Sequence, residues 1–266
     1  MTVSIRSVLK DNLRALSNWR VWWHLGMADV RNRFAKSLVG PVWIVLNLAL
    51  WVGGIGIVYA ALFGQKLETF LPFLTIGFVV WGYLIQVIID GGNAFVFAEG
   101  YIKQFTYPKQ IYVLRVIVNA SVPFVIGLAI FFVVMALLRR TFGWEMLWAL
   151  PGIALLLVAN YLHATFMAYS SARFRDLPHG MTALLQVLFF VTPVFFTVDT
   201  LKQRQLDFVY AYNPLYYLIE VVRHPLVHLE PAPLSVYAAV AIYLGIVLLA
   251  VLFVVRRLDR RIVYIL

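Results

Sequence analysis

Six long stretches of the chain contain no Asp, Glu, Lys or Arg, and none of them alternates apolar and polar residues as a half-buried strand would. A hydrocarbon core of roughly 30 Å requires about 20 such residues in a helix, because lipid offers no partner for backbone groups. Each stretch is therefore predicted to cross a membrane as an α-helix. The six predicted spans are residues 37–65, 69–89, 116–138, 146–172, 177–198 and 231–255.

A seventh apolar run, residues 208–219, has twelve charge-free residues and is too short to cross a bilayer. It contains Asn213 followed by Pro214, and a proline disfavours helical backbone at the residue before it. We therefore expect a pair of short helices here, forming a re-entrant or surface-lying segment between the fifth and sixth spans. This re-entrant region, residues 199–230, is predicted on the extracytoplasmic side.

Residues 1–36 carry the pattern of an amphipathic helix that lies in the membrane interface. Apolar side chains recur at three- and four-residue spacing, and basic side chains share another face. The apolar stripe is Ile5, Val8, Leu9, Leu13, Leu16, Trp19 and Trp23, and the basic stripe is Arg6, Lys10 and Arg14. Two interpretations stay open: a simple membrane anchor, or a collar that guides an amphiphilic substrate along the cytoplasmic leaflet.

The composition agrees with a membrane protein. Of 266 residues, 63% are hydrophobic and 13% are charged, whereas soluble domains are roughly half apolar and a quarter charged. A single core stops growing at about 250 to 300 residues. We therefore expect one all-α integral membrane domain over residues 1–266.

The 22 Lys and Arg residues are divided unevenly between the two predicted faces. Sixteen lie in residues 1–36, 90–115, 173–176 and 256–261, and six lie in the other connections. Acidic residues divide six and six, so one face carries the whole formal charge of +10. The positive-inside rule makes this face, with both termini, cytoplasmic. Short basic segments beside spans suit anionic lipids, and we expect no nucleic-acid partner.

The sequence contains no recognisable catalytic pattern. It lacks the G-x-x-x-x-G-K-[ST] loop that holds nucleotide phosphates, the H-E-x-x-H and G-x-S-x-G motifs, and any cysteine. We expect a chain that is not an enzyme and has no cofactor or metal of its own. His163 is the one ionisable residue deep inside a span, and its expected role is a hydrogen bond to a neighbouring helix.

The segment 90–115, between the second and third spans, mixes charges with aromatic residues. Such a mixture on a cytoplasmic loop suits docking to another protein, although a solvated loop would have the same composition. The residues expected at the contact are Glu99, Tyr101, Lys103, Phe105, Tyr107, Pro108 and Lys109.

Aromatic residues make up 16% of the chain, and some of them share a helix face in the first and fifth spans. Flat aromatic faces can stack on the C–H faces of sugar rings, while amides supply hydrogen bonds. Ordinary packing or lipid contact is the alternative interpretation. The residues expected along a sugar-lined path are Tyr59, Phe63, Gln186, Phe189 and Phe196.

Four segments, in order, resemble the permease subunits of type-2 ABC exporters, which move lipid-linked polysaccharides such as O-antigen or teichoic acid across the bacterial cytoplasmic membrane. Residues 29–43 are similar to that family's acidic, arginine-aromatic and Gly-Pro-x-Trp sequence before the first span. Residues 93–109 look like its cytoplasmic coupling segment. Residues 173–176 with the Pro-Val-aromatic part of the fifth span, and residues 213–215 with Glu220 and Arg223, complete the set.

The resemblance implies a half-transporter, in which two copies of the chain form a pore and two separate cytoplasmic ABC ATPases bind ATP and magnesium. Residues 99–109 would transmit the closure of the ATPases, and residues 208–219 would cap the outer end. Arg31, Arg33 and Lys36 would receive the lipid pyrophosphate where it enters, and the glycan would pass the aromatic residues named above. The implied location is the bacterial cytoplasmic (inner) membrane.

Other functions remain open from the sequence alone. A permease for a small lipid or drug is the nearest alternative. An ion-coupled secondary transporter would need intramembrane carboxylates, which the spans lack, and a membrane glycosyl- or acyltransferase would need an acid-base pair. The pair Arg139-Arg140 on the predicted outer face departs from the charge rule.

Overall fold

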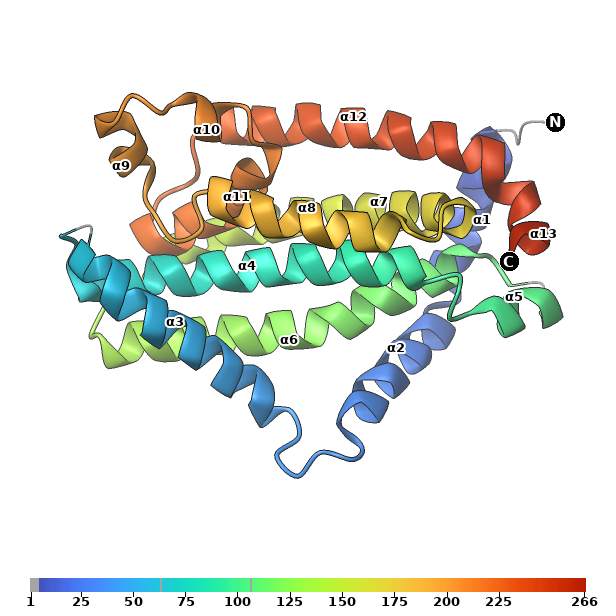
Figure 1. Ribbon diagram of the computed structural model, residues 1–266, viewed down its shortest axis with the longest axis horizontal. Helices are drawn as coiled ribbons and strands as arrows, with labels where there is room; N and C mark the ends of the chain where they lie inside the picture. Colours follow the sequence, from blue (N-terminus) through green and yellow to red (C-terminus); the bar gives the residue numbers. More distant parts are fainter. Residues whose placement is uncertain (1–4, 63, 106) are drawn as a thin grey trace.

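The computed structural model describes residues 5–62, 64–105 and 107–266, and every regular element within these ranges is a helix. Most of the long helices run along the longest axis of the molecule (Figure 1). Five stretches in the described part of the chain are long and apolar enough to cross a membrane. They are α3 (Val42–Leu62), α4 (Leu67–Asn93), α6 (Gln110–Leu137), the helix η1 (Trp144–Trp148) with α7 (Ala149–Arg173), and α12 (Leu234–Leu258) with η2 (Asp259–Arg261) and α13 (Ile262–Ile265).

The fifth predicted span, residues 177–198, is not confirmed as a full-length helix. The helix α8 (Leu177–Val191) has 15 residues, which corresponds to about 22 Å. It ends because Thr192 precedes Pro193 and adopts extended backbone, with ψ of 135°. The chain continues without helix as far as α9 (Val198–Gln203). In Figure 1 α9 lies at the opposite end of the molecule from the start of α8. The helix α8 and the non-helical chain after it therefore together run from one end of the molecule to the other.

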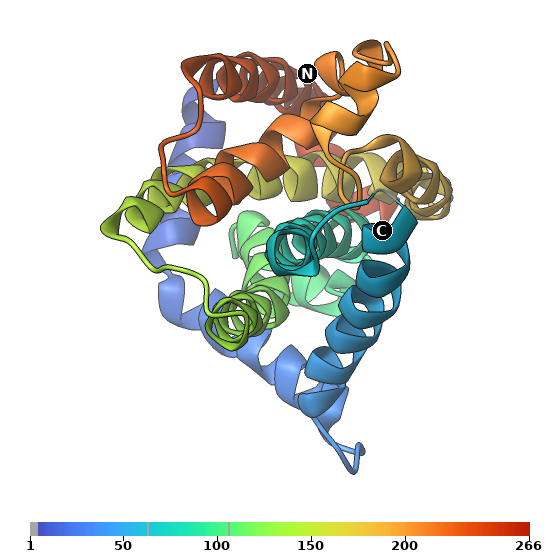
Figure 2. The same cartoon turned by 90° about the vertical axis from the view of Figure 1, so that its left-hand side faces the viewer.

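The helix α4 lies at the centre of the bundle and is the most buried of the five long helices. Figure 2, viewed along the helices, shows α3, α6 and α7 around it, while α12 lies farther away and packs on α7. At Gly91 an added Cβ would lie 2.7 Å from the Cα of Ala164 on α7. Small residues allow helix backbones to approach closely in membranes, where packing and hydrogen bonds drive association. Gly91 therefore sets the close contact between α4 and α7.

The predicted N-terminal helix is two helices, α1 (Ile5–Ser17) and α2 (Trp19–Phe34), which meet at Asn18. Val8 turns inward and is buried, whereas the rest of the described apolar stripe stays exposed. Those exposed residues are Leu9, Leu13, Leu16, Trp19 and Trp23. Because these side chains are exposed, we still predict that α1 and the start of α2 lie in the membrane interface. The helix α2 packs on α6 at Gly26, where an added Cβ would lie 2.6 Å from the Cβ of Val118.

The predicted break at Asn213 is confirmed. The helix α10 (Phe208–Ala211) ends before it and α11 (Pro214–His228) begins after it, and the Asn213 side chain accepts a hydrogen bond from the Leu215 amide at 3.1 Å. This is the usual N-cap arrangement. The helix α11 continues past the predicted run to His228, and the membrane placement of this region stays a prediction.

The two predicted faces lie at opposite ends of the molecule (Figure 1). The helix α1, the short helix α5 (Glu99–Gln104) and α13 share one end, and α9 and the connection between α3 and α4 lie at the other. Arg223, one of the six basic residues counted in the connections of the predicted outer side, is 1% exposed and bound to Glu220. One basic charge of the outer side is therefore neutralised within the protein.

Candidate functional site

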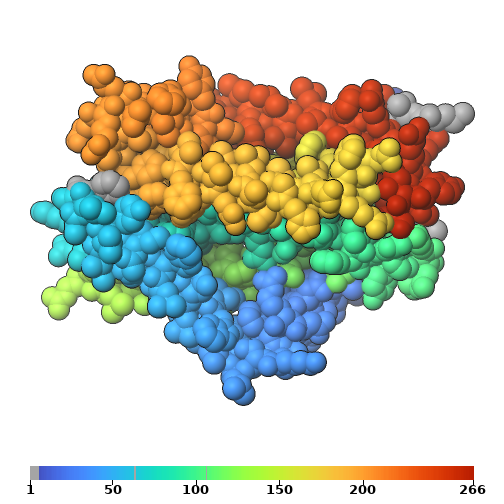
Figure 3. Space-filling model, in the orientation of Figure 1, coloured from blue at the N-terminus to red at the C-terminus, as the bar shows by residue number. Residues whose placement is uncertain are grey.

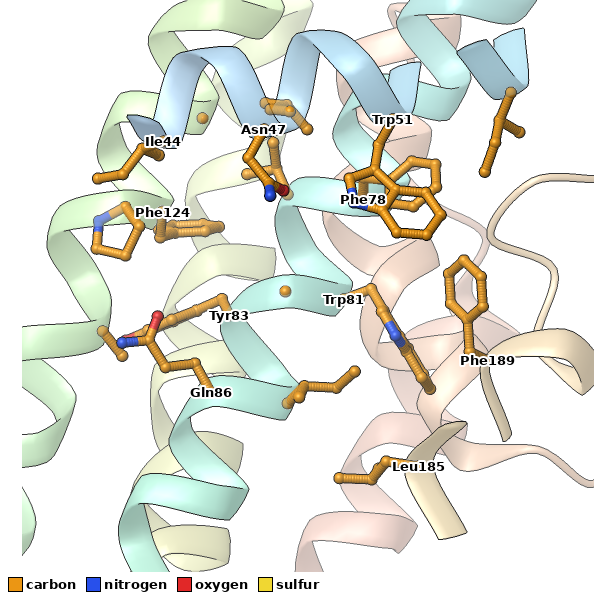
Figure 4. Close-up of a pocket in the computed structure, with 18 of the residues that line it drawn as sticks. Ile44, Asn47, Trp51, Phe78, Trp81, Tyr83, Gln86, Phe124, Leu185 and Phe189 are labelled. Carbon is orange, nitrogen blue, oxygen red and sulfur yellow. The ribbon is translucent and has the colours of Figure 1, made fainter. Parts of the chain in front are cut away.

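A large groove lies between α3, α4, α6 and α8, with a volume of about 760 Å³. In Figure 3 the surface is hollowed between the blue segments of α2 and α3. The close-up in Figure 4 shows Trp51 from α3, Trp81 from α4 and Phe124 from α6 around this space. The groove is lined mainly by apolar and aromatic side chains, as sites for organic ligands generally are.

The aromatic side chains of the groove form one connected cluster. The Phe189 ring centroid lies 5.6 Å from that of Phe78 and 5.8 Å from that of Trp81. Trp51 lies 5.9 Å from Phe78, which brings α3 into the same cluster. Tilted contacts at these distances are favourable for aromatic pairs. The cluster therefore gives the groove a wall of ring faces and edges contributed by three helices.

Few polar groups reach the groove. Asn47, Gln86 and Gln186 supply amides, and Arg33 is the one Lys or Arg that lines it in the described part of the chain. An Arg33 terminal nitrogen lies 3.7 Å from the Asp90 carboxylate. With the Gln86 amide oriented by its hydrogen bonds, its oxygen lies 3.1 Å from both Arg33 terminal nitrogens. Since Arg33 and Asp90 are each about 40% exposed, a ligand can reach the guanidinium.

The groove contains some of the residues that the sequence predicted for the path. Tyr59, Gln186 and Phe189 line it. Phe196 does not: it is buried and packs edge-on against Phe195, which does line the groove. Phe63 lies outside the described residues.

The three basic residues predicted for the headgroup behave differently from one another. Arg33 lines the groove, whereas Arg31 and Lys36 are exposed and do not line it. Arg31 precedes Arg33 by two residues, so a helix turns the two side chains about 200° apart. Lys36 lies beyond the end of α2.

The sequence did not indicate that α4 lines the groove, because its apolar residues are also typical of a helix buried on all sides. Phe78 and Trp81 are three residues apart and Ile85 follows at four, so they share one helix face. That face borders the groove rather than the bundle interior. The spacing of these residues could be read from the sequence, but the presence of a groove beside that helix face could not.

The predicted coupling segment forms a second candidate site. Its aromatic side chains stand exposed in and around α5, and we call this set, Phe97, Tyr101, Phe105 and Tyr107, the docking surface. Neighbouring rings stack, with centroids 6.3 Å apart for Tyr101 and Phe105. Glu99 and Lys103 form an ion pair of 2.6 Å beside them, and this hydrogen bond lowers the pKa of Glu99. Exposed aromatics of this kind are enriched where proteins bind each other.

Two other members of the predicted coupling set lie differently. Pro108 is partly buried, and Lys109 turns inward, where its Nζ lies 2.8 Å from the Asp259 carboxylate. The Lys109 ammonium is therefore occupied within the chain instead of facing a partner. Phe97, which the sequence analysis did not single out, is 74% exposed and extends the docking surface.

Residues 20–227 match the family described as ABC-2 type transporter. The chain belongs to this family. ABC-2 proteins are the membrane permeases of ABC transporters, so the chain is a transport subunit that works with an ABC ATPase. The matched range includes every residue that lines the groove and the whole docking surface.

The permease is also similar to the O-antigen export system permease protein RfbA of Myxococcus xanthus. The two are 25% identical over 226 residues, which cover 81% of this chain and 85% of the relative. The resemblance to type-2 ABC permeases drawn from the sequence is thereby confirmed.

Proposed function

We propose that the permease is the transmembrane subunit of an ATP-driven exporter that moves a lipid-linked polysaccharide across the bacterial cytoplasmic membrane, with both termini in the cytoplasm. The observation that carries this proposal is the groove, which combines a connected aromatic wall with a single arginine. A lipid-linked glycan needs both features, because its sugars present apolar C–H faces and its pyrophosphate is anionic.

The geometry suggests how the substrate would be arranged. Arg33 would bind the pyrophosphate through charge-assisted hydrogen bonds, which planar guanidinium groups form well with phosphate. The sugars would then pass along Phe189, Trp81 and Phe78, with Gln186 offering a hydrogen bond. A low number of fixed polar contacts favours movement, since a tightly bound polymer would not slide.

The energy for export would come from other subunits. We propose that two ABC ATPases, carrying ATP and magnesium, bind the docking surfaces of two permease copies. The groove of each copy is open along its side, and a second copy would close it into a pore. Anionic lipids would surround the basic segments at the cytoplasmic end.

The proposal is tested by deleting the gene and measuring where lipid-linked glycan accumulates. We expect accumulation inside the cell, restored to normal by the wild-type permease. Phe189→Ala should reduce export, because it removes the ring that joins Phe78 and Trp81. Phe132→Ala is the matched control, since Phe132 is an aromatic of α6 outside the groove.

The alternatives give different results in the same experiment. Normal glycan distribution in the deletion strain, together with accumulation of a small lipid or drug, would favour a small-molecule permease. Transport that persists without ATP but requires an ion gradient would indicate a secondary transporter and would overturn the proposal.

A further inference from the structure

Asp259 joins three parts of the permease at the end that carries the docking surface. It is the C-cap residue of α12 and the first residue of η2. Its Oδ1 accepts hydrogen bonds from the Lys109 Nζ and from the Tyr169 hydroxyl, each at 2.8 Å. Its backbone carbonyl accepts a further bond from Lys109 Nζ at 2.6 Å. One residue thus connects the end of the coupling segment to α7 and α12.

The beginning of the coupling segment is attached to the same place. Phe95 is fully buried, and its ring packs edge-on against Tyr169 with centroids 4.9 Å apart. Tyr169 therefore contacts the chain before α5 through its ring and the chain after α5 through Asp259. The two ends of residues 95–109 converge on the pair Tyr169 and Asp259, while the docking surface lies between them.

The surroundings of Asp259 strengthen these bonds. The Lys109 and Asp259 side chains are 18% and 19% exposed, so water and salt screen their attraction less than on an open surface. A polar cleft of about 450 Å³ lies beside them and is bounded by Asp11 and Arg14 of α1. Ile262, one turn later, is fully buried and keeps the tail on the bundle.

The neighbouring residues in the sequence behave in the opposite way. Asp259 lies among four arginines, and all four are exposed, as residues that face lipid headgroups would be. They are Arg256, Arg257, Arg260 and Arg261. The single acidic residue of this stretch turns inward and its Oδ1 accepts two hydrogen bonds, so it serves a different role from the arginines around it.

We propose that Asp259 is a positioning residue of the transport cycle, which holds the coupling segment to α7 and α12 so that movement of the docking surface is passed to the membrane helices. This rests on the proposed function in that an ABC ATPase binds the docking surface, and its transport readout also uses the proposed glycan substrate. Lys109 belongs to this connection and not to the surface that the partner covers.

Transport measurements on the complete complex test the proposal. In proteoliposomes that contain the permease with its ATPase, Asp259→Asn and Lys109→Gln should keep co-purification of the partner and basal ATP hydrolysis. Glycan delivered per ATP should fall at least about fivefold, the lower range of coupling between distant sites. The charge-reversed pair Asp259→Lys with Lys109→Asp should recover part of the loss. Tyr169→Phe, which keeps the ring on Phe95, should give an intermediate loss.

Arg260→Gln serves as the control because it removes a charge next to Asp259 without touching the connection. Normal glycan delivery per ATP in Asp259→Asn would overturn the proposal. Loss of partner binding in the Lys109→Gln variant would also overturn it, since Lys109 would then belong to the docking surface.

A distance measurement separates this proposal from the identity of the substrate. The chain has no cysteine, so Gln104→Cys on α5 and Arg260→Cys on η2 would be its two spin-labelling sites. Labelled permease is mixed with an excess of unlabelled permease and a cysteine-free ATPase, so that the measured distance lies within one chain. We expect one narrow distance distribution with and without nucleotide, and a broadened one when Asp259→Asn is added. Unchanged distributions would overturn the positioning role even if glycan export is confirmed. A failure of glycan export would leave this readout intact.

Discussion

The guanidinium of Arg115 on α6 binds the carboxylate of Asp29 on α2 through two parallel hydrogen bonds, 2.5 Å from Nε and 2.6 Å from the second nitrogen. Bidentate pairs of this kind fix orientation as well as distance. The pair lies one turn from Gly26, where α2 meets α6 most closely. Together these contacts hold the helix whose last turn carries Arg33, so the position of the groove's cation depends on them.

Asp29→Asn should therefore destabilise the permease. The neutral amide offers Arg115 one uncharged acceptor in place of two charged oxygens, so the ion pair and its bidentate geometry are lost. Arg115 is largely buried, and leaving such a group partly unsatisfied costs about 1–3 kcal/mol. The measurement is the thermal unfolding midpoint in detergent. Glu68→Gln is the control, because it removes one carboxylate from the first turn of α4. An unchanged midpoint for Asp29→Asn would show that α2 is held by packing alone.

The pair Arg33 and Asp90 predicts how the groove selects anionic ligands. Arg33→Gln should weaken binding of an isoprenoid diphosphate by about tenfold or more, because hydrogen bonds to charged groups contribute roughly 1.5–3 kcal/mol. Asp90→Asn should strengthen binding, since it removes the carboxylate that competes for the guanidinium. Quenching of the groove tryptophans reports binding directly.

Arg31→Gln is the matched control for this experiment, because Arg31 lies on the same helix but outside the groove. Equal weakening by Arg31→Gln and Arg33→Gln would indicate a general charge effect and contradict a specific role for Arg33. Weaker binding in Asp90→Asn would mean that Asp90 positions Arg33 instead of competing with the ligand.

The long spans were predictable because lipid imposes a simple rule on the sequence. Length and absence of charge identified α3, α4, α6, α7 and α12. The break at Asn213 followed from the proline after it, and the hydrogen bond of His163 to a neighbouring helix is confirmed by Tyr243 on α12, whose hydroxyl lies 2.6 Å from the imidazole. These features follow from local composition, so they could be predicted from a single sequence.

The parts that could not be predicted depend on contacts between distant residues. The inward turn of Lys109 requires Asp259, 150 residues later. The burial of Arg223 requires the carbonyl of Pro193, which α11 meets only after the chain has folded back. The groove itself arises from the gap between α3 and the rest of the bundle. The helix α8 stops early because proline outweighs an apolar composition that would favour continuation.

A cluster on α11 predicts a pH effect on stability. The hydrogen bond from His224 to Glu220 raises the pKa of His224, with Glu230 adding to the effect, while burial opposes it. A raised pKa means that this stabilisation is fully present below the ordinary value of about 6.5 and is lost as pH rises through the folded value. His228 acts in the opposite sense, because burial, followed by the charge of His224, lowers its pKa. Arg223 also faces Glu220.

We therefore expect a His228→Gln variant to unfold at progressively lower temperature as pH rises from 6 to 8. Adding His224→Gln should flatten that dependence, because the group that titrates is gone. The measurement is the thermal midpoint at a series of pH values and constant ionic strength. A slope that persists without His224 would assign the pH dependence to other groups.

Arg223 connects the outer region to the end of the fifth predicted span. Two of its nitrogens bind Glu220 at 2.9 and 2.6 Å, and the third donates to the Pro193 carbonyl at 2.8 Å. Its guanidinium carbon lies 4.0 Å from the centre of the Phe73 ring on α4. Burial raises the pKa of Glu220, but the charge of Arg223 and the hydrogen bonds of His224 and Arg223 outweigh it and lower the pKa to about 2. The carboxylate is therefore charged and depends on Arg223.

Arg223→Met should be among the most damaging single substitutions in the permease, because it leaves the Glu220 carboxylate buried without its main partner. Breaking a buried pair in this way costs about 3–5 kcal/mol. The double variant Arg223→Met with Glu220→Gln should recover much of that loss, since no uncompensated charge remains. Thermal midpoints of both variants test this, with the exposed Arg204→Met as the control. If the double variant were as unstable as Arg223→Met, the bond to Pro193 and the contact with Phe73 would account for the stability instead of charge pairing.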